Sequence, residues 1–310
     1  MTDKPGVYDI PEAEYHADPC VEPSLSSSIA KVLLNQSPRH AWTKHPRLNP
    51  AAEAVNRKDF DLGSAAHALL LEGNEPFVII AADSYRTNAA KEQRDAAYAA
   101  GKIPLLTDQA NAVHAMAAAA AVQMKGHADA FNAFAGGKPE QTLIWREGAA
   151  WCRARLDWLP DDGAIIWDYK STTDANPDAW QRRLFDLGFD VQAAFYLRGV
   201  RAVLGIENPG FRFIVQETTA PYALSINALT PAAMTMAEVK VERALSIWRW
   251  CMEHDRWPGY PKETCYIEPP PWELSKFEEM KARDEAARED GKALVEQMIA
   301  WQRPLEREAS

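Results

Sequence analysis

A charged hairpin in the middle of the chain constrains the fold more than any other stretch. Two runs rich in Trp, Ile and Leu, Trp151 to Leu159 and Ala164 to Tyr169, flank the sequence Pro160-Asp161-Asp162-Gly163. Apolar runs separated by Pro, Asp and Gly are typical of two strands joined by a turn. The sequence therefore predicts a β-hairpin here.

The hairpin gathers charged side chains of both signs. Because side chains alternate across a strand, Arg153, Arg155 and Asp157 share one face of the first strand, and Asp168 and Lys170 share one face of the second. Asp168 lies in an apolar run, where a carboxylate without a counter-charge is costly. Two carboxylates beside a lysine suit a magnesium or manganese site. A hairpin edge with ordinary solvated charges is the alternative, which the apolar surroundings of Asp168 disfavour.

The same residues resemble the signature of the PD-(D/E)xK nucleases. Asp157 and Asp168-Tyr169-Lys170 are similar to its D...(D/E)xK motif. Upstream, Gly63-Ser64-Ala65-Ala66-His67 resembles the GxxxH element of the RecB-like branch, and downstream Gln192-Ala193-Ala194-Phe195-Tyr196 resembles its QxxxY element. Each element alone is weak, but four in the family's order are more specific.

Further stretches resemble RecE-type exodeoxyribonucleases, that is, exonuclease VIII and its phage relatives. These stretches are Tyr15-His16-Ala17-Asp18, Ser24-Leu25-Ser26-Ser27-Ser28, Ser37-Pro38, and Gln216-Glu217 before Pro221-Tyr222. The resemblance extends over about residues 8 to 260. It implies an α/β fold of the restriction-endonuclease type, in which helices flank a mixed central sheet. The order of expected helices and strands is compatible with such a sheet.

The resemblance also implies a metal-binding site. Asp157, Asp168, His67 and the backbone carbonyl of Tyr169 would hold one or two Mg²⁺ ions, for which Mn²⁺ may substitute. Glu140, at the start of an expected strand, is a further candidate ligand, although an exposed strand-start glutamate is about equally compatible with the sequence. A helical histidine is usually structural, and only the family pattern favours ligation by His67.

Three more residues complete the expected catalytic site. Lys170 would position the attacking water. Gln192 and Tyr196 lie four residues apart on one face of an expected helix, where they would orient the carboxylates or bind a phosphate. A tyrosine packed in the core beside a buried glutamine is the alternative for that pair.

The formal charge of −10 weighs against DNA binding, because phosphate binding depends mostly on Lys and Arg. A local basic channel would meet this objection. Its expected DNA-binding residues are Arg153, Arg155, Ser64, Arg182 and Arg183. Encirclement of DNA by a homo-oligomer, a tetrameric ring by family resemblance, is a second way to hold the substrate.

The implied function is a Mg²⁺-dependent deoxyribonuclease, a 5′-to-3′ exonuclease that acts on double-stranded DNA ends. It would leave 3′ single-stranded overhangs for recombination by strand annealing, with a RecT-like annealing protein as partner. Two alternatives stay open: a RecB-like nuclease acting on other DNA forms, and a catalytically silent module that binds DNA ends or an annealing protein. The intact set of Asp157, Asp168 and Lys170 favours an enzyme.

The sequence further predicts an N-terminal arm (1–58), a nuclease core (59–257), a proline-rich linker (258–271) and a helical tail (272–310). No membrane-spanning run or signal peptide is recognisable, so we expect a cytoplasmic protein. The RecE-type resemblance implies a bacterial host and a phage or prophage origin. The four cysteines are far apart and form no CxxC pair. We therefore expect no zinc site, disulfide or iron–sulfur cluster.

Overall fold

The computed structural model describes residues 1–51, 62–73 and 77–289. The chain divides into two compact units, Met1–Gly259 and Tyr260–Ser310. Helix α10 (Pro271–Glu289) belongs to the second unit, and every element described below belongs to the first. None of the helices in the described ranges is both long enough and apolar enough to cross a membrane.

Among the described residues, seven strands form the central sheet: β1 (Gly6–Tyr8), β2 (Ser24–Ser26), β5 (Lys138–Glu147), β6 (Ala150–Leu159), β7 (Ile165–Thr172), β8 (Gly210–Glu217) and β9 (Leu224–Asn227). Their spatial order is β1-β5-β6-β7-β8-β9, and β2 pairs with β6 beside this path. Strands β7 and β8 are parallel, as are β2 and β6, and the other neighbours are antiparallel. This mixed sheet confirms the predicted fold class.

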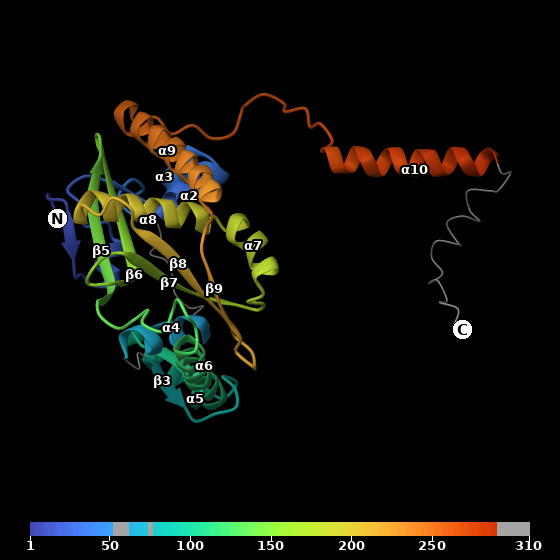
Figure 1. The fold of residues 1–310 in the computed structure, drawn as a ribbon. Helices are drawn as coiled ribbons and strands as arrows, with labels where there is room; N and C mark the ends of the chain where they lie inside the picture. Colours follow the sequence, from blue (N-terminus) through green and yellow to red (C-terminus); the bar gives the residue numbers. More distant parts are fainter. Residues whose placement is uncertain (52–61, 74–76, 290–310) are drawn as a thin grey trace, which may run out of the picture. The chain divides into compact units, whose positions relative to one another are not determined.

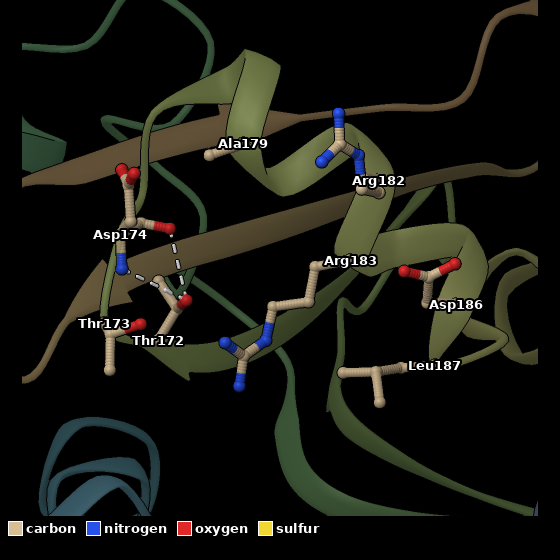
Figure 2. A pocket seen from close by; sticks show the side chains of 8 residues that line it. All are labelled: Thr172, Thr173, Asp174, Ala179, Arg182, Arg183, Asp186 and Leu187. Atoms are coloured by element: carbon tan, nitrogen blue, oxygen red, sulfur yellow. Dashed lines mark hydrogen bonds between the residues drawn. The ribbon is translucent and has the colours of Figure 1, made fainter. Parts of the chain in front are cut away.

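The connection from β7 to β8 passes through two helices, α7 (Pro177–Asp186) and α8 (Phe189–Leu204). Parallel neighbours require such a crossover, because a short turn cannot return the chain to the same end of the sheet. Asn176 caps α7 by accepting a hydrogen bond from the backbone of Asp178, and proline occupies the first helical position. In Figure 2, α7 runs beside the end of β7.

One face of the sheet is covered by α8 together with α2 (Ser27–Asn35) and α9 (Pro231–His254) (Figure 1). Helix α3 (Pro38–Lys44) packs against α2 and α9. Large side chains fill the space between the helices and the sheet, and the largest of those that are fully buried are Trp145, Trp180, Trp248, Phe195 and Phe213. This core fixes α8 against the strands that carry the acidic residues.

The other face of the sheet is covered by a smaller group of elements: α4 (Leu62–Glu72), β3 (Phe77–Ile80), α5 (Asn88–Ala99), β4 (Ile103–Leu106) and α6 (Thr107–Lys125). Strands β3 and β4 form a separate parallel pair. Leu71 of α4 and Met124 of α6 pack in one apolar cluster with Trp158, Trp167 and Tyr169 of the sheet. This packing holds α4 and its histidine over β7.

The prediction of a separate arm over residues 1–58 needs correction, as far as residues 1–51 show. Strand β1 pairs with β5, and β2 pairs with β6, so both belong to the central sheet. Helix α1 (Glu12–His16) lies between them in the chain, and Tyr15 on it is buried. Leu25 and Ile29 pack inside the main core. The N-terminal stretch therefore helps to build the nuclease core.

Strand β6 pairs with two different strands along the same edge. Its opposite edge is occupied by β5 along its length. Near its start, Trp151 to Arg153 pair with β2, and near its end the described pairing with β7 is Trp158 with Trp167. The predicted hairpin thus exists, but its strands diverge. We call the part of β6 between Arg153, the last residue paired with β2, and Trp158, which pairs with β7, the β6 fork.

Candidate active site

Asp157 lies at the β6 fork. Its Oδ2 accepts a hydrogen bond from the backbone N–H of Tyr169 at 2.9 Å and lies 3.1 Å from Nε2 of His67. The carboxylate thus bridges β6 to β7 where the strands no longer pair directly. Burial by itself would raise the pKa of Asp157, but the charges of His67 and Lys170 outweigh burial and hold that pKa well below its usual range.

Asp168 on β7 is the most deeply buried acid of the site, with 1% of its surface exposed. Its Oδ1 accepts hydrogen bonds from Nζ of Lys170 at 2.6 Å and from Nε2 of Gln192 at 2.8 Å. Burial, and then the nearby carboxylate of Asp157, raise the pKa of Asp168 to about 7. A further positive charge near these two carboxylates would stabilise the ionised form of both.

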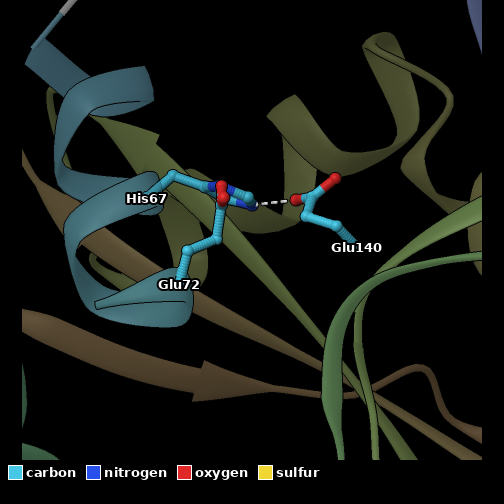
Figure 3. Close-up of side chains that lie close together, drawn as sticks. All are labelled: His67, Glu72 and Glu140. Atoms are coloured by element: carbon cyan, nitrogen blue, oxygen red, sulfur yellow. Dashed lines mark ion pairs between the residues drawn. The ribbon is translucent and has the colours of Figure 1, made fainter. Parts of the chain in front are cut away.

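His67 projects from α4 toward the same acids. Its Nε2 lies 3.7 Å from Oε1 of Glu140, and the ligand atoms of His67, Glu72 and Glu140 lie within 4.8 Å of one another (Figure 3). Burial lowers the pKa of His67, but Asp157 and then Glu140 overcome this effect and raise it to about 8. Sequence reasoning missed Glu72, because it follows His67 by five residues, outside the spacing that marks one helix face.

The donor atoms at the fork fit a divalent cation. Adjacent ligands of an octahedral Mg²⁺ ion lie about 3 Å apart, given metal–oxygen distances near 2.1 Å. Nε2 of His67 and Oδ2 of Asp157 form an ion pair at 3.1 Å, and at this separation both atoms could be neighbouring ligands once a cation replaces the imidazole proton. Carboxylate oxygens are the ligands that Mg²⁺ and Mn²⁺ prefer. The ligand role of the Tyr169 carbonyl stays a prediction.

Glu140 has an unusual backbone conformation for a strand residue. Its φ is 55°, and in the register of β5 and β6 it falls opposite Asp157, between the pairs formed by Pro139 and Gln141. A left-handed conformation costs a non-glycine residue about 1–2 kcal/mol. Such strain is often retained at functional sites. Its side chain forms an ion pair with Arg155 as well as facing His67.

The strain at Glu140 gives a testable difference between two variants. Glu140→Gly and Glu140→Ala lose the same carboxylate, but only glycine adopts a positive φ without steric penalty. We expect Glu140→Gly to be more stable than Glu140→Ala by about 1 kcal/mol in urea unfolding. Equal stabilities would mean that the backbone relaxes once the carboxylate is removed.

The two predicted residues of α8 occupy different surroundings. Gln192 contacts Asp168 directly, as described above. Tyr196 is buried in the main core, where its ring packs edge-on against Phe211. Burial raises the pKa of Tyr196 well above its usual value. Gln192 is therefore placed to orient Asp168, whereas Tyr196 belongs to the apolar core between α8 and the sheet.

The arginines expected beside Asp157 are bound within the protein. Arg153 is only 4% exposed, and its Nη1 lies 2.7 Å from both the carbonyl and the hydroxyl oxygen of Ser24 and 3.3 Å from Asp18. Arg155 pairs with Glu140 and donates to the carbonyl of Ile10 at 2.8 Å. The expectation that Arg153 contacts DNA therefore needs correction, because a buried guanidinium does not reach a phosphate.

Arg182 and Arg183 instead line an open hollow of about 370 Å³ beside the end of β7 (Figure 2). Neither forms an ion pair with any residue that the structure describes. Thr172 also lines the hollow, two residues after Lys170 and on the same face of β7. Asp174 and Asp186 add two acids to the lining. Ser64, another expected DNA contact, is exposed on α4.

Comparisons with known proteins agree with this geometry. Residues 26–269 match the model of a family described as "PDDEXK-like domain of unknown function (DUF3799)". The fold is similar to the crystal structure of a "Putative exonuclease" from Eubacterium rectale, with a TM-score of 0.51 and 15% sequence identity, over 81% of this chain and 93% of that one. No curated protein sequence matches the chain. The chain thus belongs to the PDDEXK-like family, and its mixed sheet with acids at the β6 fork is a PD-(D/E)xK nuclease fold.

Proposed function

We propose that this protein is a Mg²⁺-dependent deoxyribonuclease, specifically a 5′-to-3′ exonuclease acting on double-stranded DNA ends. The observation that carries the proposal is the convergence of His67, Asp157, Asp168 and Lys170 at the β6 fork. Family membership supports nuclease chemistry. The polarity, and a role in producing 3′ overhangs for strand annealing, rest on the resemblance to RecE-type enzymes.

In this proposal His67, Asp157 and Asp168 hold the metal, and Glu140 and Glu72 are further candidates on one side of the site. A bound divalent cation would lower the pKa of a water molecule and stabilise charge on the scissile phosphate. No nucleophilic side chain is then required. The backbone of Tyr169 keeps the Asp157 carboxylate fixed across the fork.

Lys170 and Gln192 act on the substrate side of the same carboxylates. Asp168 holds the ammonium group of Lys170 in place beside the proposed metal site. From this position the ammonium group would orient the attacking water and contact the scissile phosphate. Gln192 restricts the orientation of Asp168 through the hydrogen bond to Oδ1. Such preorganised groups need little rearrangement as charge develops in the transition state.

We assign the remaining DNA contacts to the hollow beside β7. Arg182 and Arg183 present guanidinium groups there without an ion-pair partner in the described part of the chain, and Ser64 is exposed on α4. The RecE-type resemblance further supports a ring-shaped homo-oligomer, a tetramer, with a RecT-like annealing protein as partner. An oligomer that encircles DNA would offset the net charge of −10.

A single digestion experiment tests the proposed function. Linear duplex labelled separately at its 5′ and 3′ ends is incubated with the protein beside a closed circle, with and without Mg²⁺. We expect loss of the 5′ label first, an intact circle and no reaction without metal. Cleavage of the circle would favour a nuclease acting on other DNA forms. Binding without any metal-dependent cleavage would favour a silent end-binding module.

A further inference from the structure

A second, positively charged hollow lies next to the active site on the side of α2 and α9. It measures about 250 Å³, and its charged lining consists of Lys31 from α2, Asp190 from α8, and Lys240 and Arg243 from α9. None of these residues belongs to the catalytic set above. We call it the Lys31 hollow.

The ring of Phe189 lies close both to the lysine of this hollow and to Lys170. Nζ of Lys31 lies 5.5 Å from the ring centroid, and Nζ of Lys170 lies 5.1 Å from the same centroid. The distance between the two ammonium groups therefore cannot exceed the sum of these two distances. This upper limit is large enough for the two ammonium groups to contact successive phosphates of one nucleic acid strand.

The backbone of Gly188 fixes the place of Lys31. A Cβ at this position would lie 2.8 Å from Cδ of Lys31, closer than van der Waals contact allows. Gly188 also has a φ of 66°, at the junction of α7 and α8. The lysine stem thus lies directly against the backbone that precedes Phe189, and its ammonium group extends past this backbone toward the ring.

The Lys31 hollow has more positive charge than its own acid neutralises. Asp190 is fully buried and pairs with Lys240 at 2.6 Å. Lys31 and Arg243 have no carboxylate partner within the ranges that the structure describes. Burial, followed by the like charge of Lys170, lowers the pKa of Lys31, and the carboxylates of Asp168 and Asp190 oppose this shift without reversing it.

A further polar atom in the hollow is unsatisfied. Oδ1 of Asp190 is buried without a hydrogen-bond partner among the described residues. Buried polar atoms of this kind usually pair with ordered water or a ligand. The acceptor oxygen of Asp190 thus calls for an ordered water in the hollow, while Lys31 and Arg243, which have no carboxylate partner among the described residues, suit an anion.

We propose that the Lys31 hollow binds a backbone phosphate of the DNA strand being cut, next to the scissile phosphate held at Lys170. This inference rests on the proposed function. Phosphate contacts of this type position a nucleic acid without reading its sequence. Lys31 and Arg243 would bind the phosphate, while Asp190 keeps Lys240 in place between α8 and α9.

The salt dependence of DNA binding tests the site. The double variant Lys31→Gln/Arg243→Gln is compared with wild type by fluorescence anisotropy on a short labelled duplex, with EDTA present to prevent cleavage. Each lost phosphate contact lowers the slope of log affinity against log salt by about 0.7–0.9. Because both side chains bind the same phosphate, we expect a slope lower by about 0.7–0.9 in the double variant, and a loss of affinity of about tenfold at low salt.

Two controls keep the result specific. Lys91→Gln/Arg94→Gln on α5 removes the same charge elsewhere and is expected to leave the slope nearly unchanged. Lys31→Arg keeps the charge in the hollow and is expected to retain the wild-type slope, and melting curves check that every variant is folded.

An unchanged slope in Lys31→Gln/Arg243→Gln, beside a wild type that cleaves DNA, would overturn the site alone. A wild type that neither binds nor cleaves DNA would overturn the proposed function as well.

Discussion

Replacing Asp168 with asparagine is expected to reduce DNA cleavage by about a thousandfold or more, because the variant loses a charged metal ligand worth several kcal/mol of transition-state stabilisation. Asparagine has nearly the same shape and still accepts the hydrogen bond that Gln192 donates to Oδ1. The strand itself stays apolar around the substituted position. Single-turnover rates at saturating Mg²⁺ measure the effect.

The same substitution should not weaken the fold of the metal-free protein. Asp168 is buried against Asp157, and this like charge contributes to the raised pKa of Asp168. Removing one of two neighbouring buried acids relieves that repulsion, and Lys170, which loses its ion pair with Asp168, keeps the charge of Asp157 nearby. We therefore expect a melting temperature at least as high as that of wild type. Asp83→Asn, which removes the charge of an exposed acid, serves as the control and should leave both rate and melting temperature unchanged. Retained Mg²⁺-dependent turnover in Asp168→Asn would refute the site assignment.

Replacing Lys170 with glutamine is expected to lower the cleavage rate by about 100- to 1000-fold, the usual effect of removing one preorganised donor from an active site. The ammonium group contacts Asp168 and lies over the ring of Phe189, so it has a defined position before substrate binds. Glutamine keeps part of the hydrogen bonding but not the charge that faces the phosphate.

Metal affinity separates this role of Lys170 from that of a ligand. In the proposed mechanism Lys170 contacts the carboxylate and the substrate rather than the cation. Isothermal titration should therefore show that Lys170→Gln binds Mn²⁺ almost as tightly as wild type, and more tightly than Asp168→Asn. Lys170→Arg, which keeps the charge on a longer side chain, should recover part of the rate. A loss of Mn²⁺ affinity equal to that of Asp168→Asn would show that Lys170 acts by holding the ligand in place.

Strand alternation was sufficient to predict that Asp157, Asp168 and Lys170 converge. Both strands are apolar and long enough for the period of two to determine which side chains share a face. Helical spacing likewise placed Gln192 on α8, and its contact with Asp168 depends only on how that helix crosses the sheet. The strand and helix periods are local patterns that a single sequence carries, whereas the crossing of α8 over the sheet depends on the whole core.

The surroundings of Arg153 could not be predicted in the same way. Alternation places Arg153 on the face of Asp157, but its burial depends on Ser24 and Asp18, which come from the opposite end of the chain. Strand β2 has only three residues, Ser-Leu-Ser, and such a segment shows no recognisable period. The sequence therefore predicted a loop-rich arm where the structure has a strand of the sheet.

The shared edge of β6 has a consequence for the order in which the molecule assembles. The hydrogen bond between Arg153 and Ser24 joins residues 129 positions apart, whereas the turn that joins β6 to β7 spans only a few residues. Closing a long loop is slow, because its conformational entropy is lost before any contact compensates for it. We therefore expect the β6–β7 turn to form early and β2 to dock late. During synthesis β2 leaves the ribosome long before β6 exists, so the catalytic fork becomes complete only when the first and the middle parts of the chain meet.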